Sequence, residues 1–317
     1  MTGDPLAALS APWDEPTAAI NAAMNQAAAG QPPVSTRDPV DIRVESDSFA
    51  RSTRKRVEEA VDRTIAGLPA RVFLPPTVES VYLYIHGGAW MMGANDLADE
   101  MLWARATRAN TAVISMDYRL APEHRWPAQA DDCEAVALWV AEHATEEFGT
   151  DRLIIGGDSA GAHLSVVTLL RLRDRHHASP FCGADLRYGM YDLRLTPGAR
   201  QYEGAFLDAP ALRWILDLCF DADSREDPLV SPLLADLRGL PPALFTVGTN
   251  DSLLEDTLFM WARWRAAGNE ADLVIHPGGM HAFDYLPVPA AAKSLDDSVA
   301  FIQRLSTPAR RPATASS

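Results

Sequence analysis

The sequence has few cysteines and fewer basic than acidic residues. Its three cysteines, Cys133, Cys182 and Cys219, are an odd number with no paired spacing, so we do not expect disulfides to organise the fold. The 28 Lys and Arg are outnumbered by 43 Asp and Glu, which gives a formal net charge of −15. Because no basic stripe is present to neutralise phosphates, nucleic acid is excluded as a partner.

Long apolar runs are also missing. No run reaches the length of a membrane span, and the first residues, Met1 to Pro5, lack the basic and apolar regions of a secretion signal. We therefore expect no membrane partner and a cytoplasmic location. His176 and His177 have no partner at metal-ligand spacing and are interpreted as a solvated helix end. The hydrophobic content of 47% is still enough for a large interior.

A serine flanked by glycines follows one of the short apolar segments. Leu153 to Gly156 predicts a buried strand, Gly157-Asp158-Ser159-Ala160-Gly161 follows it, and a helical pattern begins directly afterwards. This arrangement is typical of a nucleophile on a tight turn, where glycines let the strand and the helix approach closely. The helix that begins near Ser159 would direct its free N–H groups and positive dipole end toward the reacting centre.

Upstream, a second apolar segment runs into paired glycines. Val81 to Ile85 predicts a buried strand, and His86-Gly87-Gly88-Ala89-Trp90 follows it. Paired glycines leave backbone N–H groups uncovered, as an oxyanion hole requires. We therefore predict an oxyanion hole made by the N–H groups of Gly87, Gly88 and Ala160, with His86 holding the loop through a side-chain hydrogen bond. The alternative is an ordinary glycine turn beside a buried histidine.

Downstream, two further strands end near an acid and a histidine. Ala243 to Gly248 predicts a strand that ends near Asp251, where an acid that orients a catalytic histidine would lie. Ala271 to His276 predicts the next strand, followed by a loop that carries His281. The chain order of oxyanion loop, serine, aspartate and histidine is typical of α/β hydrolases and differs from the orders in chymotrypsin and subtilisin.

Other titratable residues compete with these candidates. Glu255 and Asp256 could replace the predicted acid, but both are expected inside the helix that follows it. His276 lies within a strand pattern and is interpreted as structural. Asp158 is expected to form hydrogen bonds within the turn that carries the serine, and His163, one helical turn further on, is expected to pack in the interior.

The alternation of segments defines the fold class. From about residue 70 onward, strand and helix patterns alternate, which predicts a mostly parallel central sheet with helices on both faces. With the chain order above, this is an α/β protein with the α/β-hydrolase fold.

Two further segments make a family resemblance specific. Residues 118–124 read Tyr-Arg-Leu-Ala-Pro-Glu-His, and residues 227–233 read Asp-Pro-Leu-Val-Ser-Pro-Leu. Together with the motifs above, residues 70–305 resemble the hormone-sensitive-lipase-type branch of the α/β hydrolases (bacterial family IV), which includes many small carboxylesterases. The chain departs from the family's four motifs by one residue in each: Ala89, Ala162, Ser252 and Ala282. The added Cβ atoms of Ala89 and Ala282 are expected to narrow the acyl pocket.

The resemblance implies a serine carboxylesterase for short- to medium-chain acyl esters. Ser159 would attack the ester carbonyl, His281 would transfer the proton, and Asp251 would orient the imidazole. A small-molecule ester is the expected partner, no metal or organic cofactor is required, and a homodimer is left open. An amidase, arylformamidase or lactonase on the same triad is an alternative. So is a non-catalytic ligand-binding member of the fold, although such receptors lose the catalytic histidine.

The resemblance also implies a helical cap. We expect residues 1–45 to form an N-terminal cap segment and residues 46–305 to form the catalytic domain, with a cap insertion near 192–225. Residues 306–317 are expected to be a disordered tail, because they are low in apolar residues.

Some residues near the predicted loops suggest contact with substrate. Trp90 and Phe283 each adjoin a catalytic loop, and we predict that they line the substrate pocket. Arg119 and Glu123 are instead expected to pair with each other, because their proline-containing loop needs internal polar contacts to stay ordered.

Overall fold

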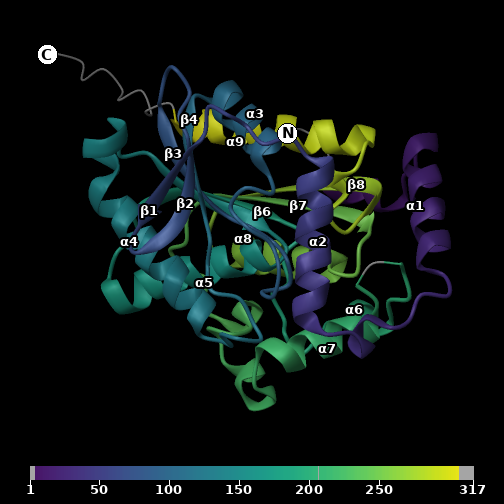
Figure 1. Ribbon diagram of the computed structural model, residues 1–317. Coiled ribbons are helices and arrows are strands. Elements are labelled where there is room, and N and C mark those ends of the chain that lie inside the picture. The colour runs from purple at the N-terminus through teal and green to yellow at the C-terminus, as the bar shows by residue number, and fades with distance from the viewer. Residues whose placement is uncertain (1–3, 206, 307–317) are drawn as a thin grey trace, which may run out of the picture.

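An eight-stranded sheet forms the centre of the protein (Figure 1). The structure is a computed structural model that describes residues 4–205 and 207–306. The strands lie in the order β1-β2-β4-β3-β5-β6-β7-β8. Their bounds are β1 (Val61–Ile65), β2 (Leu68–Phe73), β3 (Ser80–Ile85), β4 (Thr111–Met116), β5 (Leu153–Asp158), β6 (Phe181–Arg187), β7 (Ala243–Asn250) and β8 (Ala271–Met280).

The sheet is parallel except at one edge. β2 runs antiparallel to both β1 and β4, and all the other neighbours are parallel. β3, β4 and β5 are buried along their whole length, as expected for parallel strands that helices cover on both faces. The predicted mostly parallel sheet is confirmed. The carboxyl ends of the parallel strands lie on the same side of the sheet, and the loops that carry the predicted site residues follow those strand ends.

Helices cover both faces of the sheet. Figure 1 shows α3 (Asp99–Ala109) and α9 (Pro289–Ser306) on one face, and α5 (Ala160–His176) and α8 (Leu254–Ala266) on the other. α4 (Ala128–Phe148) packs beside α5. α6 (Pro197–Gln201) and α7 (Ala209–Cys219) lie between β6 and β7, where the cap insertion near 192–225 was expected. α1 (Glu15–Ala28) and α2 (Pro39–Thr53) precede the sheet.

Three helices, α1, α2 and α7, begin with the same pair of residues, an aspartate cap and an early proline. Asp14, Asp38 and Asp208 precede α1, α2 and α7, and each carboxylate accepts a hydrogen bond from a backbone N–H in the first turn of its helix. A proline occupies the first or second position of each helix. Both features satisfy or remove N–H groups that a helix start leaves unpaired.

Two of the expected segment boundaries fall inside helices, and the division into cap and catalytic domain stays a prediction. The boundary at residue 45 falls inside α2, which continues to Thr53, so the N-terminal helical segment is longer than predicted. Ser306 was assigned to the tail but is the last residue of α9, where its buried hydroxyl donates a hydrogen bond to Ser80 Oγ at 2.8 Å. The rest of the predicted tail, residues 307–317, lies outside the described residues.

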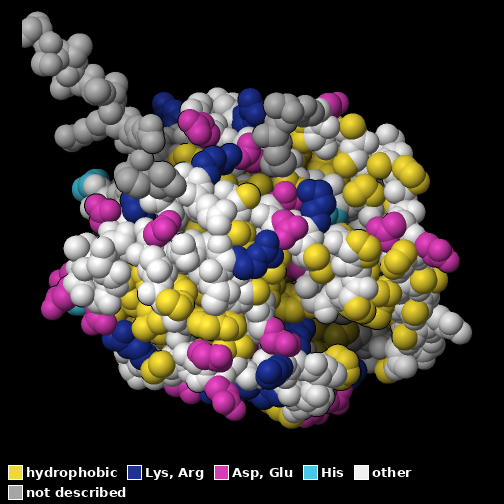
Figure 2. All heavy atoms as spheres, turned by 90° about the horizontal axis from the view of Figure 1, so that it is seen from above, with side chains coloured by type: hydrophobic (Ala, Val, Ile, Leu, Met, Phe, Trp, Pro, Cys, Tyr) yellow, Lys and Arg dark blue, Asp and Glu magenta, His cyan; other side chains and the backbone are white. Residues whose placement is uncertain are grey.

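The surface charges and the composition of the helices relate to the prediction that the protein has no membrane partner. On the face in Figure 2, basic and acidic side chains are interspersed with each other. Within residues 4–205 and 207–306, no helix has the length and apolar composition needed to cross a bilayer.

Candidate active site

Ser159 lies on a sharp turn between β5 and α5. Its φ is 55° and its ψ is −118°, a conformation that costs on the order of 1–3 kcal/mol in a residue with a side chain. A Cβ atom at Gly157 or at Gly161 would collide with the carbonyl oxygen of Ile85 on the neighbouring strand. The two glycines are therefore required by the close packing of β3, β5 and α5, and this packing holds the serine on its turn.

His281 connects the serine to the aspartate. Its Nε2 lies 2.9 Å from Ser159 Oγ, and its Nδ1 lies 3.0 and 3.1 Å from the two carboxylate oxygens of Asp251. With Nδ1 protonated, the imidazole donates to Asp251 and accepts from the Ser159 hydroxyl. Asp251 follows β7 directly, and its Oδ1 also accepts a hydrogen bond from the N–H of Leu253 at 2.8 Å. The structure thus brings the three predicted residues into one hydrogen-bond chain.

The loop expected before His281 is part of a strand. β8 continues through Pro277 to Met280, so His281 is the first residue after the strand. β8 is the edge strand of the sheet, and a proline is tolerated there because an edge strand has one unpaired side. A bulge between Gly248 and Asn250 keeps the two strands paired up to Met280, which places the histidine beside the acid at the end of β7.

The competing acids hold the segment that leads into the cap. Glu255 accepts a hydrogen bond from the N–H of Gly198 at 2.7 Å. Asp256 accepts from the N–H groups of Tyr191 and Asp192 at 2.7 and 2.8 Å. Its complete burial raises the pKa of the Asp256 carboxyl to about 7. Both acids lie in α8 as predicted, away from the end of β7.

The other two histidines near the site are structural, as predicted. Burial lowers the pKa of His163 and of His276 to about 4, so both rings are neutral near pH 7. His163 lies 2.9 Å from the carbonyl oxygen of Val230 and accepts a hydrogen bond from the indole N–H of Trp90 at 3.2 Å. The ring of His276 packs on that of Phe283.

The glycine loop after β3 packs against the serine turn. A Cβ atom at Gly87 would lie 2.8 Å from the carbonyl oxygen of Asp158, and one at Gly88 would collide with that of Met92. The φ of Gly88 is 116°, which favours glycine. In the part of the chain that the structure describes, the N–H groups of Gly87, Gly88 and Ala160 donate no hydrogen bond to protein atoms. All three N–H groups therefore lack a protein acceptor among the described residues, and their role as an oxyanion hole stays a prediction.

His86 holds this loop in the manner that we predicted. Its Nδ1 lies 2.7 Å from the carbonyl oxygen of Gly87, and its ring stacks on Tyr118 with 4.2 Å between the ring centroids. The Tyr118 hydroxyl donates to the carbonyl oxygen of His86 at 3.0 Å. The expected side-chain hydrogen bond is confirmed.

The two predicted pocket residues are buried among protein side chains. Trp90 packs edge-on against Phe220 with 4.9 Å between ring centroids. Phe283 packs against His276, and also against Tyr188. Trp90 and Phe283 lie beside the loops that carry the predicted site residues, as expected from their positions in the sequence. That they line the substrate pocket stays a prediction.

The expected pairing of Arg119 with Glu123 is wrong. Arg119 forms its ion pair with Asp132 at 2.8 Å. Glu123 pairs at 2.7 Å with Arg43 of the N-terminal helix α2. The loop is thus held by two other elements, which local sequence cannot reveal because residue 43 is 80 positions before residue 123.

Asp158 forms its hydrogen bonds outside the serine turn, contrary to our expectation. Its Oδ1 accepts from the Tyr84 hydroxyl, and its Oδ2 accepts from the Tyr285 hydroxyl at 3.1 Å. Sequence reasoning missed both tyrosines. The available signal was a tyrosine within the buried strand pattern of β3, because a buried tyrosine hydroxyl usually has a hydrogen-bond partner.

Metal ligands and disulfides do not contribute to this arrangement. Within the described ranges, 4–205 and 207–306, no three His, Cys, Asp or Glu side chains gather in a way that could hold a metal ion. Cys133, Cys182 and Cys219 are free thiols. A serine on a strand-to-helix turn, bonded to a histidine and an aspartate at the ends of later strands, is the arrangement of serine hydrolases with the α/β-hydrolase fold.

Comparison with known proteins places the chain in a family. Residues 82–285 match the family described as alpha/beta hydrolase fold. Carboxylesterase NlhH of Mycobacterium tuberculosis is 35% identical over 253 residues, which cover 76% of this chain and 79% of that enzyme. An acetyl esterase of Salmonella schwarzengrund is 29% identical over 261 residues, which cover 78% of this chain and 80% of that enzyme.

Solved structures agree with the sequence comparison. A hyperthermophilic esterase from the archaeon Pyrobaculum calidifontis has a TM-score of 0.85 at 27% identity, over 93% of this chain and 99% of that one. A hormone-sensitive lipase from a metagenome library has a TM-score of 0.83 at 25% identity, over 94% and 100%. The chain belongs to the hormone-sensitive-lipase-type branch of the α/β hydrolases, as its motifs predicted.

Proposed function

We propose that this protein is a serine carboxylesterase that hydrolyses short- to medium-chain acyl esters. The proposal is carried by the hydrogen-bond chain from Ser159 through His281 to Asp251, with 2.9 Å between Ser159 Oγ and His281 Nε2. A serine hydroxyl is a weak nucleophile at neutral pH and needs an adjacent base within hydrogen-bond reach. The names of the relatives, carboxylesterase and acetyl esterase, support an ester as the bond that is cleaved.

In the first half of the reaction, Ser159 Oγ attacks the ester carbonyl carbon while His281 Nε2 takes the hydroxyl proton. Asp251 stabilises the imidazolium that forms. The N–H groups of Gly87, Gly88 and Ala160 bind the oxyanion of the tetrahedral intermediate, and the positive end of the α5 dipole adds to their effect. As the bond to the alcohol oxygen breaks, His281 returns its proton to the leaving alcohol and the acyl group stays on Ser159.

In the second half, water attacks the acyl-enzyme. His281 removes a proton from the water, and a second tetrahedral oxyanion forms in the same N–H pocket. When the bond to Ser159 Oγ breaks, the histidine gives the proton back to the serine and the carboxylic acid is released. The residues named here carry out both halves without a metal or an organic cofactor.

The remaining expectations concern partners and location. The proposed partner is a small-molecule ester, and a second copy of the chain in a homodimer stays a prediction that light scattering would test. We also propose a cytoplasmic location, which the three free thiols support because reduced cysteines persist in that compartment. Fractionation of the source cells, with the protein detected by antibody, would test the location.

The proposal is tested with p-nitrophenyl esters of increasing acyl length. We expect the unsubstituted protein to hydrolyse the acetyl and butyryl esters, and the Ser159→Ala variant to lose at least about 10³-fold in kcat. Equal rates for the two proteins would show that the triad assignment is wrong. Two further substrates test the alternatives: butyryl p-nitroanilide for an amidase and a simple lactone for a lactonase. A faster rate on either one than on the p-nitrophenyl ester would overturn the assignment as a carboxylesterase.

A further inference from the structure

The loop that carries the predicted oxyanion donors has a strained backbone. Between residues 86 and 93, four residues have positive φ: Gly88 at 116°, Ala89 at 54°, Trp90 at 58° and Gly93 at 99°. Two of them carry side chains, for which a left-handed conformation costs about 1–2 kcal/mol each. Such a backbone persists only when its surroundings hold it in place, so the contacts made to this loop decide where its N–H groups point.

Two charged contacts to the loop come from the N-terminal helix α2. The Nε of Arg43 donates to the carbonyl oxygen of Met91 at 2.6 Å. The Oδ1 of Asp47 accepts a hydrogen bond from the N–H of Gly93 at 3.2 Å. Residues four apart lie on the same face of a helix, so one face of α2 binds the loop backbone at two positions. Hydrogen bonds with an ionised partner are roughly twice as strong as neutral ones.

The inward face of α2 carries charged as well as apolar side chains, since Asp47 is buried together with Ile42 and Ala50. A surface helix usually turns its charged residues to water and its apolar residues to the core. Here Arg43 and Asp47 are turned inward, with the Arg43 side chain 19% exposed and Asp47 9% exposed. Val44 and Phe49 point outward and are 58% and 70% exposed. Asp47 binds a backbone group of the loop, and Arg43 binds both the loop backbone at Met91 and the carboxylate of Glu123.

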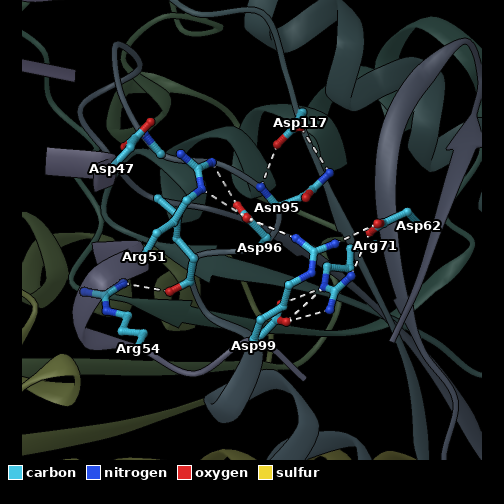
Figure 3. A network of polar contacts seen from close by, with 12 residues as sticks. Asp47, Arg51, Arg54, Asp62, Arg71, Asn95, Asp96, Asp99 and Asp117 are labelled. Carbon is cyan, nitrogen blue, oxygen red and sulfur yellow. Dashed lines mark hydrogen bonds and ion pairs between the residues drawn. The ribbon is translucent and has the colours of Figure 1, made fainter. Parts of the chain in front are cut away.

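The end of α2 is fixed to the segment that follows the loop. Figure 3 shows Arg51 paired with Asp96, at 3.1 Å. Arg54 donates to the carbonyl oxygen of Leu97 at 2.7 Å. Asn95 is in turn bound through its N–H to Asp117, the residue after β4, at 2.6 Å. The helix is therefore held in a set position relative to the sheet, and through it the loop is held as well.

We propose that Arg43 and Asp47 are positioning residues for the oxyanion loop. By holding the backbone at Met91 and Gly93, they keep the N–H groups of Gly87 and Gly88 directed at the oxyanion. The inference rests on the proposed esterase function. It gives α2 a task besides its expected role in the cap, because the helix would contribute to transition-state binding through the loop backbone.

The test compares the variants Asp47→Ala and Asp47→Asn in kcat and KM on p-nitrophenyl butyrate. It also measures the affinity for a trifluoromethyl ketone, whose adduct with Ser159 carries an oxyanion. Misplaced oxyanion donors cost rate rather than substrate binding, so we expect Asp47→Ala to lose about 10- to 100-fold in kcat with KM changed less than about twofold. The ketone should bind more weakly by the same factor. Asp47→Asn keeps an oxygen acceptor for Gly93 and should stay within about threefold of the unsubstituted protein.

Glu45→Ala is the matched control, because Glu45 lies on α2 in an exposed ion pair with Arg37. It should behave as the unsubstituted protein does. The proposal is overturned if Asp47→Ala keeps its kcat, or if its kcat falls while the ketone binds unchanged. If circular dichroism shows that Asp47→Ala does not fold, Arg43→Met decides by the same criteria. A failure of the proposed function would show separately, as an unsubstituted protein no more active than Ser159→Ala.

Discussion

The hydroxyl of Tyr285 lies 3.1 Å from Oδ2 of Asp158 and joins the loop after His281 to the turn that carries Ser159. Asp158 directly precedes the serine, and its carboxylate is buried. Tyr84 of β3 donates to the same carboxylate. The serine and the histidine are thus connected twice, once directly and once through this part-buried contact between their neighbouring residues. A hydrogen bond to a charged group contributes about 1.5–3 kcal/mol to stability.

Removing the Tyr285 hydroxyl should therefore loosen the site. We expect Tyr285→Phe to lower the free energy of unfolding by about 1.5–3 kcal/mol, as measured by urea denaturation, and to lower kcat several-fold. Tyr191→Phe is the matched control, since the Tyr191 hydroxyl is buried without a hydrogen-bond partner among the described residues. An equal loss of stability in the two variants would contradict the account.

Asp256 should make stability depend on pH. Burial raises the pKa of its carboxyl to about 7, against about 3.9 in an unfolded chain. Between these values the folded state binds more protons than the unfolded state. Its contribution to stability is therefore complete below about pH 4 and is lost as the pH rises through about 7. The loss is about 1.4 kcal/mol per pH unit within that window.

The variant Asp256→Asn isolates this effect. Asparagine keeps the oxygen that accepts from the N–H groups of Tyr191 and Asp192, but it does not titrate. Urea denaturation at pH 5, 6 and 7 should show the unsubstituted protein losing stability relative to the variant as the pH rises. Two curves that stay parallel over this range would show that Asp256 titrates normally.

Ala89 and Ala282 should limit the acyl chain. Both have positive φ, 54° and 60°, at positions where the family usually has glycine, so glycine fits their backbone without strain. We expect the unsubstituted protein to hydrolyse acetyl and butyryl esters much faster than longer ones. The double variant Ala89→Gly/Ala282→Gly should raise the ratio of decanoyl to butyryl kcat/KM by about tenfold, as estimated from lost steric exclusion. An unchanged ratio would place the limit on chain length elsewhere, for example in the cap.

The residues that we propose as catalytic could be found from the sequence because each is marked by local chemistry. Glycines beside Ser159, and a strand end before Asp251, are visible within a few positions of the chain. The predicted strand ended at His276, whereas β8 runs through Pro277 to Met280. It continues because it lies at the edge of the sheet, where the missing N–H breaks no ladder. That position is a property of the whole sheet and cannot be derived from the segment alone.

The contacts that hold the loops could not be predicted in the same way. Arg43 and Asp47 bind backbone groups 48 and 46 positions further along the chain. A backbone group has the same chemistry at every residue, so the sequence carries no complementary signal for such a partner. Glu123 was paired with Arg119 of the same loop, but its partner is Arg43 on α2, 80 positions earlier in the chain.

The central claim is that Ser159 is the nucleophile of an esterase. It is tested most directly by treating the protein with diethyl p-nitrophenyl phosphate, which transfers its phosphoryl group to an activated serine and releases p-nitrophenol. We predict one adduct per chain, on Ser159 by peptide mass spectrometry, formed in step with the loss of esterase activity. Activity that survives complete labelling of Ser159, or that is lost through labelling of another residue, would contradict the account.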